Sequence, residues 1–319
     1  MRMMQNPGMT DAGKQRSLLR RRIQRNWQAY VLLAIPLIYL LVFKYYPMFG
    51  VQIAFKNFQA AKGIWGSPWV GFAQFEKFFT SSQFKRILPN TVILSLYALA
   101  AGFPIPILLA LSLNTLRSNR FKKIVQTITY IPHFISVVVI VGMMMAIFSP
   151  RTGLVGTVYH MITGRVMADL FGKPAAFRHL YVWSGVWQSM GWSSIIYMAA
   201  LSGVDQQLHE AAQIDGASRL QRVFHIDVPS ILPTAVILLI LNSGNIMSIG
   251  FEKIYIMQNT MNLRASEVIS TYVYKVSMAA GGGDFSYGTA IGLFNSVINL
   301  AMLCLVNFIS KKVTSSSLW

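Results

Sequence analysis

The sequence predicts an all-α integral membrane protein with six transmembrane helices. Of its 319 residues, 54% are hydrophobic and 12% are charged, whereas a soluble domain averages about 45–50% and about 25%. A helix of about 20 apolar residues can cross a bilayer, and six stretches of at least 18 residues contain no Asp, Glu, Lys or Arg. These stretches are 26–43, 87–116, 124–150, 179–204, 228–251 and 285–310.

Each stretch defines one expected span. The spans lie at about 28–48, 89–112, 124–148, 181–203, 230–251 and 286–309. The first stretch is only just long enough, but no small-residue cleavage site follows Phe43, so we interpret it as a retained helix rather than a signal peptide. The chain then divides into a basic N-terminal tail (1–25), a six-helix membrane domain (26–310) and a C-terminal tail (311–319).

The distribution of basic residues predicts the orientation of the chain. Segments on the same side as the N-terminus carry 15 Lys and Arg in 64 residues, and the opposite segments carry 13 in 104. Because Lys and Arg concentrate in cytoplasmic loops, both termini are expected in the cytoplasm. The net charge of +18 is better explained by a membrane surface than by nucleic acid, since the basic residues lie between long apolar runs.

The sequence lacks the patterns of several catalytic and cofactor sites. Its single cysteine, Cys304, excludes a disulfide framework and a zinc site of paired thiolates. The five histidines show no H-E-x-x-H spacing, and neither a nucleophile elbow nor an ATP-binding P-loop occurs. We expect no enzyme activity, metal or cofactor in this chain.

The segment 205–229, between the fourth and fifth spans, predicts two short amphipathic helices. We expect Asp205 to cap the first helix and Gly216 to end it in a left-handed conformation. Asp215 is expected to cap the second helix and Pro229 to stop it. An ordinary loop hairpin is the alternative interpretation.

The same segment offers a surface for a partner protein. The small residues Ala211 and Ala212 permit close approach, and Glu210 can meet a basic residue across the contact. Its pattern E-A-A-x-x-D-G-A, followed by Phe224 and Pro229, resembles the EAA loop of permease subunits of bacterial ATP-binding-cassette (ABC) importers. Further matches are to the sugar-importer branch that includes the maltose permease: Val70-Gly71-Phe72, Tyr130-Ile131-Pro132 and Leu201-Ser202-Gly203.

Within this branch, the segments 26–30 and 43–55 most resemble polysaccharide and oligosaccharide permeases, which include alginate importers. The resemblance implies the transmembrane domain of a type I ABC importer in the bacterial cytoplasmic (inner) membrane. It also implies a second homologous permease, two ATPase subunits that bind ATP and Mg, an extracytoplasmic solute-binding protein and a carbohydrate substrate. The residues expected to couple to the ATPase are Glu210, Ala211, Ala212, Asp215, Gly216, Ala217 and Phe224.

Polar and aromatic residues inside the spans are candidates for the substrate route. Amides and hydroxyls can bond sugar hydroxyls, and Trp faces can stack on sugar rings. These candidates are Trp187, Gln188, Trp192, Asn242, Asn245, Ser248, Asn295 and Asn299. The alternative is that they only bond neighbouring helices, as polar residues in membrane bundles commonly do.

Two other functions stay open from the residues alone. A stand-alone secondary carrier or channel would transport without ATPase subunits, but the absence of carboxylates in the six runs counts against proton coupling. An intramembrane enzyme would need a clustered nucleophile and base. The extracytoplasmic segments carry 13 basic and five acidic residues, so we expect an acidic, alginate-like substrate rather than a neutral one.

Overall fold

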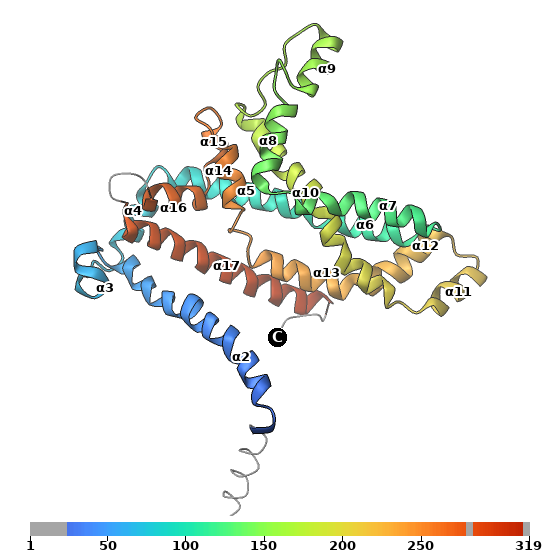
Figure 1. Ribbon diagram of the computed structural model, residues 1–319, viewed down its shortest axis with the longest axis horizontal. Helices are drawn as coiled ribbons and strands as arrows, with labels where there is room; N and C mark the ends of the chain where they lie inside the picture. The colour runs from blue at the N-terminus through green and yellow to red at the C-terminus, as the bar shows by residue number, and fades with distance from the viewer. Residues whose placement is uncertain (1–23, 279–282, 315–319) are drawn as a thin grey trace, which may run out of the picture.

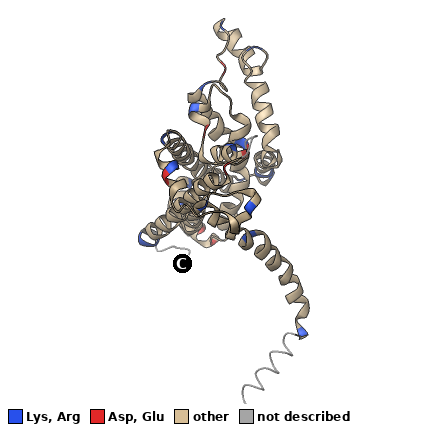
Figure 2. Cartoon of the chain, turned by 90° about the vertical axis from the view of Figure 1, so that its left-hand side faces the viewer, with Lys and Arg blue, Asp and Glu red and all other residues tan. Residues whose placement is uncertain are grey.

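The computed structural model describes residues 24–278 and 283–314. Within these ranges the chain is helical, and the one β-type pairing is the isolated antiparallel bridge between Lys56 and Trp69. Most of the expected basic tail and the last five residues of the expected C-terminal tail lie outside the described residues. Figure 2 shows Lys, Arg, Asp and Glu as isolated patches on a ribbon that is otherwise uncharged.

The helices follow one another without a sheet in the described part of the chain. They are α2 (Trp27–Leu40), α3 (Gly63–Gly66), α4 (Ala73–Thr80), α5 (Phe84–Gly102), α6 (Pro104–Asn114), α7 (Asn119–Tyr130), α8 (Val137–Ile147), α9 (Leu154–Thr163), α10 (Pro174–Ser202), α11 (Gln206–Ile214), α12 (Arg219–Arg222), α13 (Val228–Ser243), α14 (Phe251–Met257), α15 (Leu263–Ser266), α16 (Ile269–Met278) and α17 (Phe285–Thr314).

Four continuous helical stretches are long and apolar enough to cross a membrane. They are Trp27–Phe55, Phe84–Asn114, Arg219–Ser243 and Phe285–Lys312. A fifth exists if Asn119–Phe134 and Val137–Ile147 form one broken span. The remaining expected span lies in α10, which has 29 residues but is not apolar enough to be counted with the others. The count of six therefore stays a prediction.

The position of α10 explains its more polar composition. It packs against α5, α6, α7 and α13, and α10 contributes buried side chains to two of the three hydrophobic clusters of the described core. Figure 1 shows α10 beside α6 and α7, while α2 and the α8–α9 arm extend away from the body. Because much of α10 faces protein, its polar groups can be bonded by neighbouring helices.

The third expected span, 124–148, is not straight. Its two halves meet at an angle of 102°, with a 3-10 turn at Ile131–Phe134 between them. Pro132 in this turn has no backbone N–H to donate, and the Ser136 side chain caps the restarted helix by accepting from the N–H of Val139. The sequence interpretation missed this bend because the whole run 124–150 lacks Asp, Glu, Lys and Arg, and charge content alone gives no sign of a break within it.

The fifth expected span, 230–251, has different bounds in the structure. Helical residues run continuously from Arg219 to Ser243 and then stop, so 244–250 is non-helical. The prediction that Pro229 stops the preceding helix is wrong. Pro229 lies in the first turn of α13, and the wider π-helical turn at Val223–Asp227 accommodates a residue that cannot donate an N–H.

Candidate functional site

The helix pair predicted in segment 205–229 is present as α11 and α12. The Asp205 side chain caps α11 by accepting from the N–H of Gln207 at 2.9 Å. At the other end the N–H of Ala217 donates to the carbonyl of Ala212 at 2.9 Å, and Gly216 has a left-handed φ of 81°. This C-terminal capping motif satisfies carbonyls in the last turn of α11 and requires a residue that tolerates positive φ.

The cap of the second helix differs from the prediction. Ser218, not Asp215, is its N-cap, and a reciprocal capping box joins Ser218 to Gln221. Asp215 instead follows the last residue of α11. Serine followed three residues later by glutamine is a recognisable capping pattern, and sequence reading could have found it.

The pair presents apolar side chains that no other described residue of the chain covers. The exposed fraction is 87% for Ile214, 70% for Leu220 and 65% for Phe224. Glu210 and Ala211 are also exposed, and Ala212 is half-buried. An exposed apolar patch with a charged neighbour is typical of a protein–protein contact.

A buried carboxylate that sequence reading did not assign connects this pair to the membrane helices. Asp227, 2% exposed, lies just before α13. Its Oδ1 is 3.3 Å from Nε2 of His209 on α11 and accepts from Nδ2 of Asn114, the last residue of α6, at 3.4 Å. One buried side chain thus contacts both α11 and α6 and lies at the start of α13.

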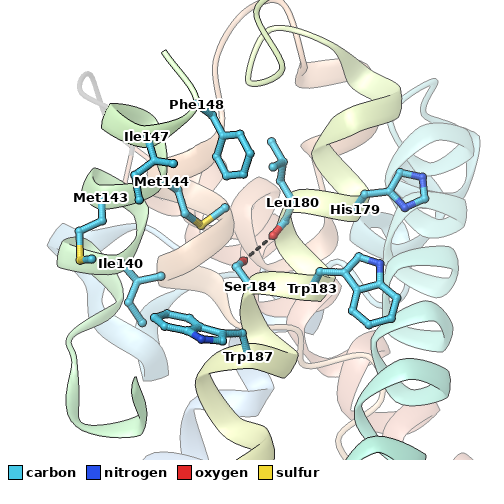
Figure 3. A pocket seen from close by; sticks show the side chains of 10 residues that line it. All are labelled: Ile140, Met143, Met144, Ile147, Phe148, His179, Leu180, Trp183, Ser184 and Trp187. Carbon is cyan, nitrogen blue, oxygen red and sulfur yellow. Dashed lines mark hydrogen bonds between the residues drawn. The ribbon is translucent and has the colours of Figure 1, made fainter. Parts of the chain in front are cut away.

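The α10 candidates for the substrate route lie on different faces of their helix. Trp187 lines an apolar cavity of about 460 Å³ between α8 and α10, together with Met143, Met144 and Trp183. Figure 3 shows Ile140 and Met144 of α8 facing Trp187 of α10 across this space, whereas Trp183 points to the other side of α10. The wall offers little for a sugar hydroxyl to bond, so it fits an apolar group better than a carbohydrate.

Gln188 and Trp192 contact the bend between α7 and α8. The Gln188 side chain donates to the carbonyl of Ile135 at 3.0 Å. Trp192 stacks on His133 with ring centroids 4.7 Å apart and planes 1° apart, and it lines a cavity of about 450 Å³ with Asn242. The structure thus brings Trp192 and Asn242 together on one cavity, with an aromatic face and an amide in reach of the same space.

The remaining candidates separate into two groups. Asn299 on α17 supports the chain break after α13: its Oδ1 accepts from the N–H of Met247 at 2.9 Å, and its Nδ2 donates to Ser248 at 2.8 Å. Asn245 is exposed in the same break. These hydrogen bonds are of the kind that the alternative interpretation, bonding between neighbouring helices, expects.

Asn295 has a different environment. Its Oδ1 is buried and has no hydrogen-bond partner, as is also true of the Ser270 hydroxyl. Both residues line a cavity of about 550 Å³ with the aromatic rings of Phe251 and Tyr274. A polar ligand or water in this cavity would satisfy two buried groups that the described residues leave unpaired.

Comparison with known proteins identifies the family. Residues 102–315 match the model of the binding-protein-dependent transport system inner membrane component. Two curated relatives from Bacillus subtilis (strain 168) align over nearly the whole chain. The polygalacturonan/rhamnogalacturonan transport system permease protein YteP is 42% identical, covering 94% of this chain and 92% of the relative. Protein LplB is 39% identical, covering 93% and 92%.

Solved structures agree with the sequence comparison. A bacterial ABC transporter involved in the import of the acidic polysaccharide alginate matches with a TM-score of 0.84 and 38% identity, covering 93% of this chain and 99% of that chain. The same fold occurs in a bacterial alginate ABC transporter in complex with an alginate pentasaccharide-bound periplasmic protein, at 37% identity and a TM-score of 0.84. The chain therefore belongs to the family of inner-membrane components of binding-protein-dependent transport systems, and it is a permease subunit of an ABC importer rather than an enzyme.

Proposed function

We propose that this permease forms half of the membrane route for an acidic oligosaccharide, such as an alginate-like or galacturonate-containing chain. The support is the similarity to two groups of transporters whose names state acidic polysaccharides, together with the excess of basic residues in the extracytoplasmic segments. A cationic entrance raises the local concentration of anionic substrate.

The assembly that we propose contains a second homologous permease, two ATPase subunits that bind ATP and Mg, and a solute-binding protein. The support for partners is the unburied apolar surface of this single chain. No residue of α2 is buried, and Leu32 and Ile35 are 72% and 66% exposed. Lipid and a second permease together would cover such a helix.

The observation that carries the coupling role is the geometry of α11 and α12. An exposed patch containing Ile214, Leu220 and Phe224 would dock on an ATPase, with Glu210 meeting a basic residue. The link from His209 through Asp227 to Asn114 would then pass the motion of the ATPase to α6 and α13. The bundle would alternate between inward and outward opening as nucleotide shifts the two-state equilibrium.

The test is ATP hydrolysis by the complex reconstituted in proteoliposomes with its binding protein. We expect stimulation by an alginate or galacturonate trisaccharide, weak stimulation by its carboxyl-reduced counterpart, and a higher KM for the acidic form at high salt. Stimulation by the neutral sugar alone would remove the acidic substrate while leaving the importer family intact. Uptake without ATPase subunits would favour the alternative, a stand-alone carrier or channel.

A further inference from the structure

Lys253 is a buried cation among the helices. It lies on α14 with an exposed fraction of 7%, and its Nζ donates to the carbonyl of Tyr181 at 3.2 Å. The ammonium also lies 5.2 Å from the centroid of the Tyr181 ring. Tyr181 is also the first residue of the expected span 181–203, so Lys253 lies at one end of the membrane part of α10. A buried lysine is costly unless its charge is compensated.

No carboxylate neutralises this cation in the part of the chain that the structure describes. None of the ion pairs among residues 24–278 and 283–314 includes Lys253. An ammonium has three N–H donors, and one of them is used by Tyr181. A buried charge is stable when it is paired, so the environment of Lys253 favours an anionic ligand.

The ammonium borders a cavity that has room for such a ligand. The cavity has a volume of about 250 Å³, and its lining includes the polar side chains of Gln188 and Ser189. Gly185 and Gly102 lie in the same wall. A Cβ at Gly185 would lie 3.4 Å from Nζ, so the glycine keeps the approach to the charge open.

This cavity adjoins the one that holds Trp192 and Asn242. Gly102 lines both cavities, and a Cβ at this position would meet nothing within 4 Å. The two spaces thus adjoin at the end of α5: the Lys253 cavity lies between α5, α10 and α14, and the other lies between α6, α10 and α13. One offers an aromatic face and an amide, and the other offers a cation with an amide and a hydroxyl. An acidic sugar chain carries matching groups on successive units.

We propose that Lys253 is a carboxylate-binding subsite of the translocation route and selects uronate-containing chains over neutral ones. This inference rests on the proposed function and adds a specificity-determining residue to it. The ligand carboxylate would accept from the free N–H donors of Lys253, while Gln188 and Ser189 bond hydroxyls of the same sugar unit. Removing a charged hydrogen-bond partner of a bound carboxylate weakens binding by about tenfold or more.

The experiment uses the full reconstituted complex and the acidic trisaccharide that stimulates the wild type, together with its carboxyl-reduced form. We expect Lys253→Met to raise the KM for the acidic sugar at least about tenfold while leaving the KM for the neutral sugar unchanged. Lys253→Arg should stay within about threefold of the wild type, since the positive charge is retained.

Lys56 supplies a matched control. It is also buried, with Nζ donating to the carbonyl of Ile64 at 2.7 Å and lying 4.7 Å from the centroid of the Trp69 ring. It belongs to the segment between α2 and α3 and not to the lining of the Lys253 cavity. Lys56→Met removes a similarly held lysine, so an equal effect of both variants would show that loss of a buried lysine, not of the subsite, is responsible.

Ser189→Asp tests the subsite with Lys253 in place. The new carboxylate would occupy the same cavity and compete with the substrate, so selective loss of acidic-sugar stimulation is expected even if Lys253→Met fails to assemble. An unchanged KM for the acidic sugar in the assembled Lys253→Met complex, or equal losses for acidic and neutral sugars, would overturn the inference. The wild-type response alone decides the proposed function: a wild type that accepts only neutral sugar refutes the acidic substrate itself.

Discussion

Gly216 shows how one residue determines the shape of the coupling surface. Its φ of 81° lets α11 end in a C-terminal capping motif, after which Ser218 caps the start of α12. The Cβ that another residue would bring meets nothing within 4 Å. Backbone conformation, and not space, is therefore the reason for glycine at this position.

Replacement of Gly216 by valine is expected to uncouple the importer. A β-branched residue held in the left-handed region is strained by about 1–2 kcal/mol or more, so α11 and α12 would change their relative orientation. We expect lower substrate-stimulated hydrolysis and less uptake per ATP in the reconstituted complex. The control is Gly203→Ala, because Gly203 has a negative φ of −87° and can accept a side chain. Normal uptake per ATP in an assembled Gly216→Val complex would exclude this segment as the coupling element.

At the scale of elements, a break between α13 and α14 interrupts the expected fifth span. Residues 244–250 leave the helix, and Asn299 on α17 bonds both Met247 and Ser248. Met247 is only 3% exposed, so its backbone N–H depends on this partner. One side chain of the last helix thus stabilises the irregular segment that leads to α14 and Lys253.

Asn299→Leu should destabilise the permease. It leaves the buried N–H of Met247 without an acceptor, which costs about 1–3 kcal/mol. A lower thermal midpoint of the purified complex is the expected result. Ser296→Ala is the matched control, since Ser296 is exposed on the same helix and bonds only the carbonyl of Gly292. Equal midpoints for the Asn299 variant and this control would show that the break is held by other contacts.

At the scale of the whole molecule, the orientation in the membrane decides whether the α11–α12 pair can reach a cytoplasmic ATPase. Figure 1 shows α9 and the α11–α12 pair far apart, at the ends of different arms of the molecule. The density of basic residues predicts that the α11–α12 side and both termini face the cytoplasm. This orientation is open to direct measurement.

The accessibility of introduced cysteines measures which side of the membrane each segment faces. In a Cys304→Ser background, a cysteine at Ser118 or Ser218 should react only from the cytoplasm, and one at Thr163 only from outside. All three positions are exposed, so accessibility to a membrane-impermeant reagent reports the side of the membrane. Labelling of the Ser218→Cys variant from outside intact cells would invert the topology and place the α11–α12 pair away from any cytoplasmic ATPase.

Local and compositional signals in the sequence determined the fold class, the family and both ends of α11. Long uncharged runs predicted an all-helical membrane fold, and the Asp205 cap and Gly216 reversal depend on backbone interactions within a few residues of each other. The E-A-A-x-x-D-G-A pattern identified the permease family because its positions lie close together in sequence. Signals of this range can be read without knowing which helices are neighbours.

The tertiary structure alone decided which polar residues face a cavity and which hold helices together. Asn295 and Asn299 lie one turn apart on α17, yet one borders a cavity and the other bonds a segment about fifty residues earlier in the chain. Lys253, outside every expected span, meets the cavity of α5 and α10 only because the chain breaks after α13. The physical reason is that lipid and neighbouring helices are both apolar, so hydrophobic periodicity does not reveal which face of a membrane helix meets protein. Bends in the chain and contacts between distant residues determine that face instead.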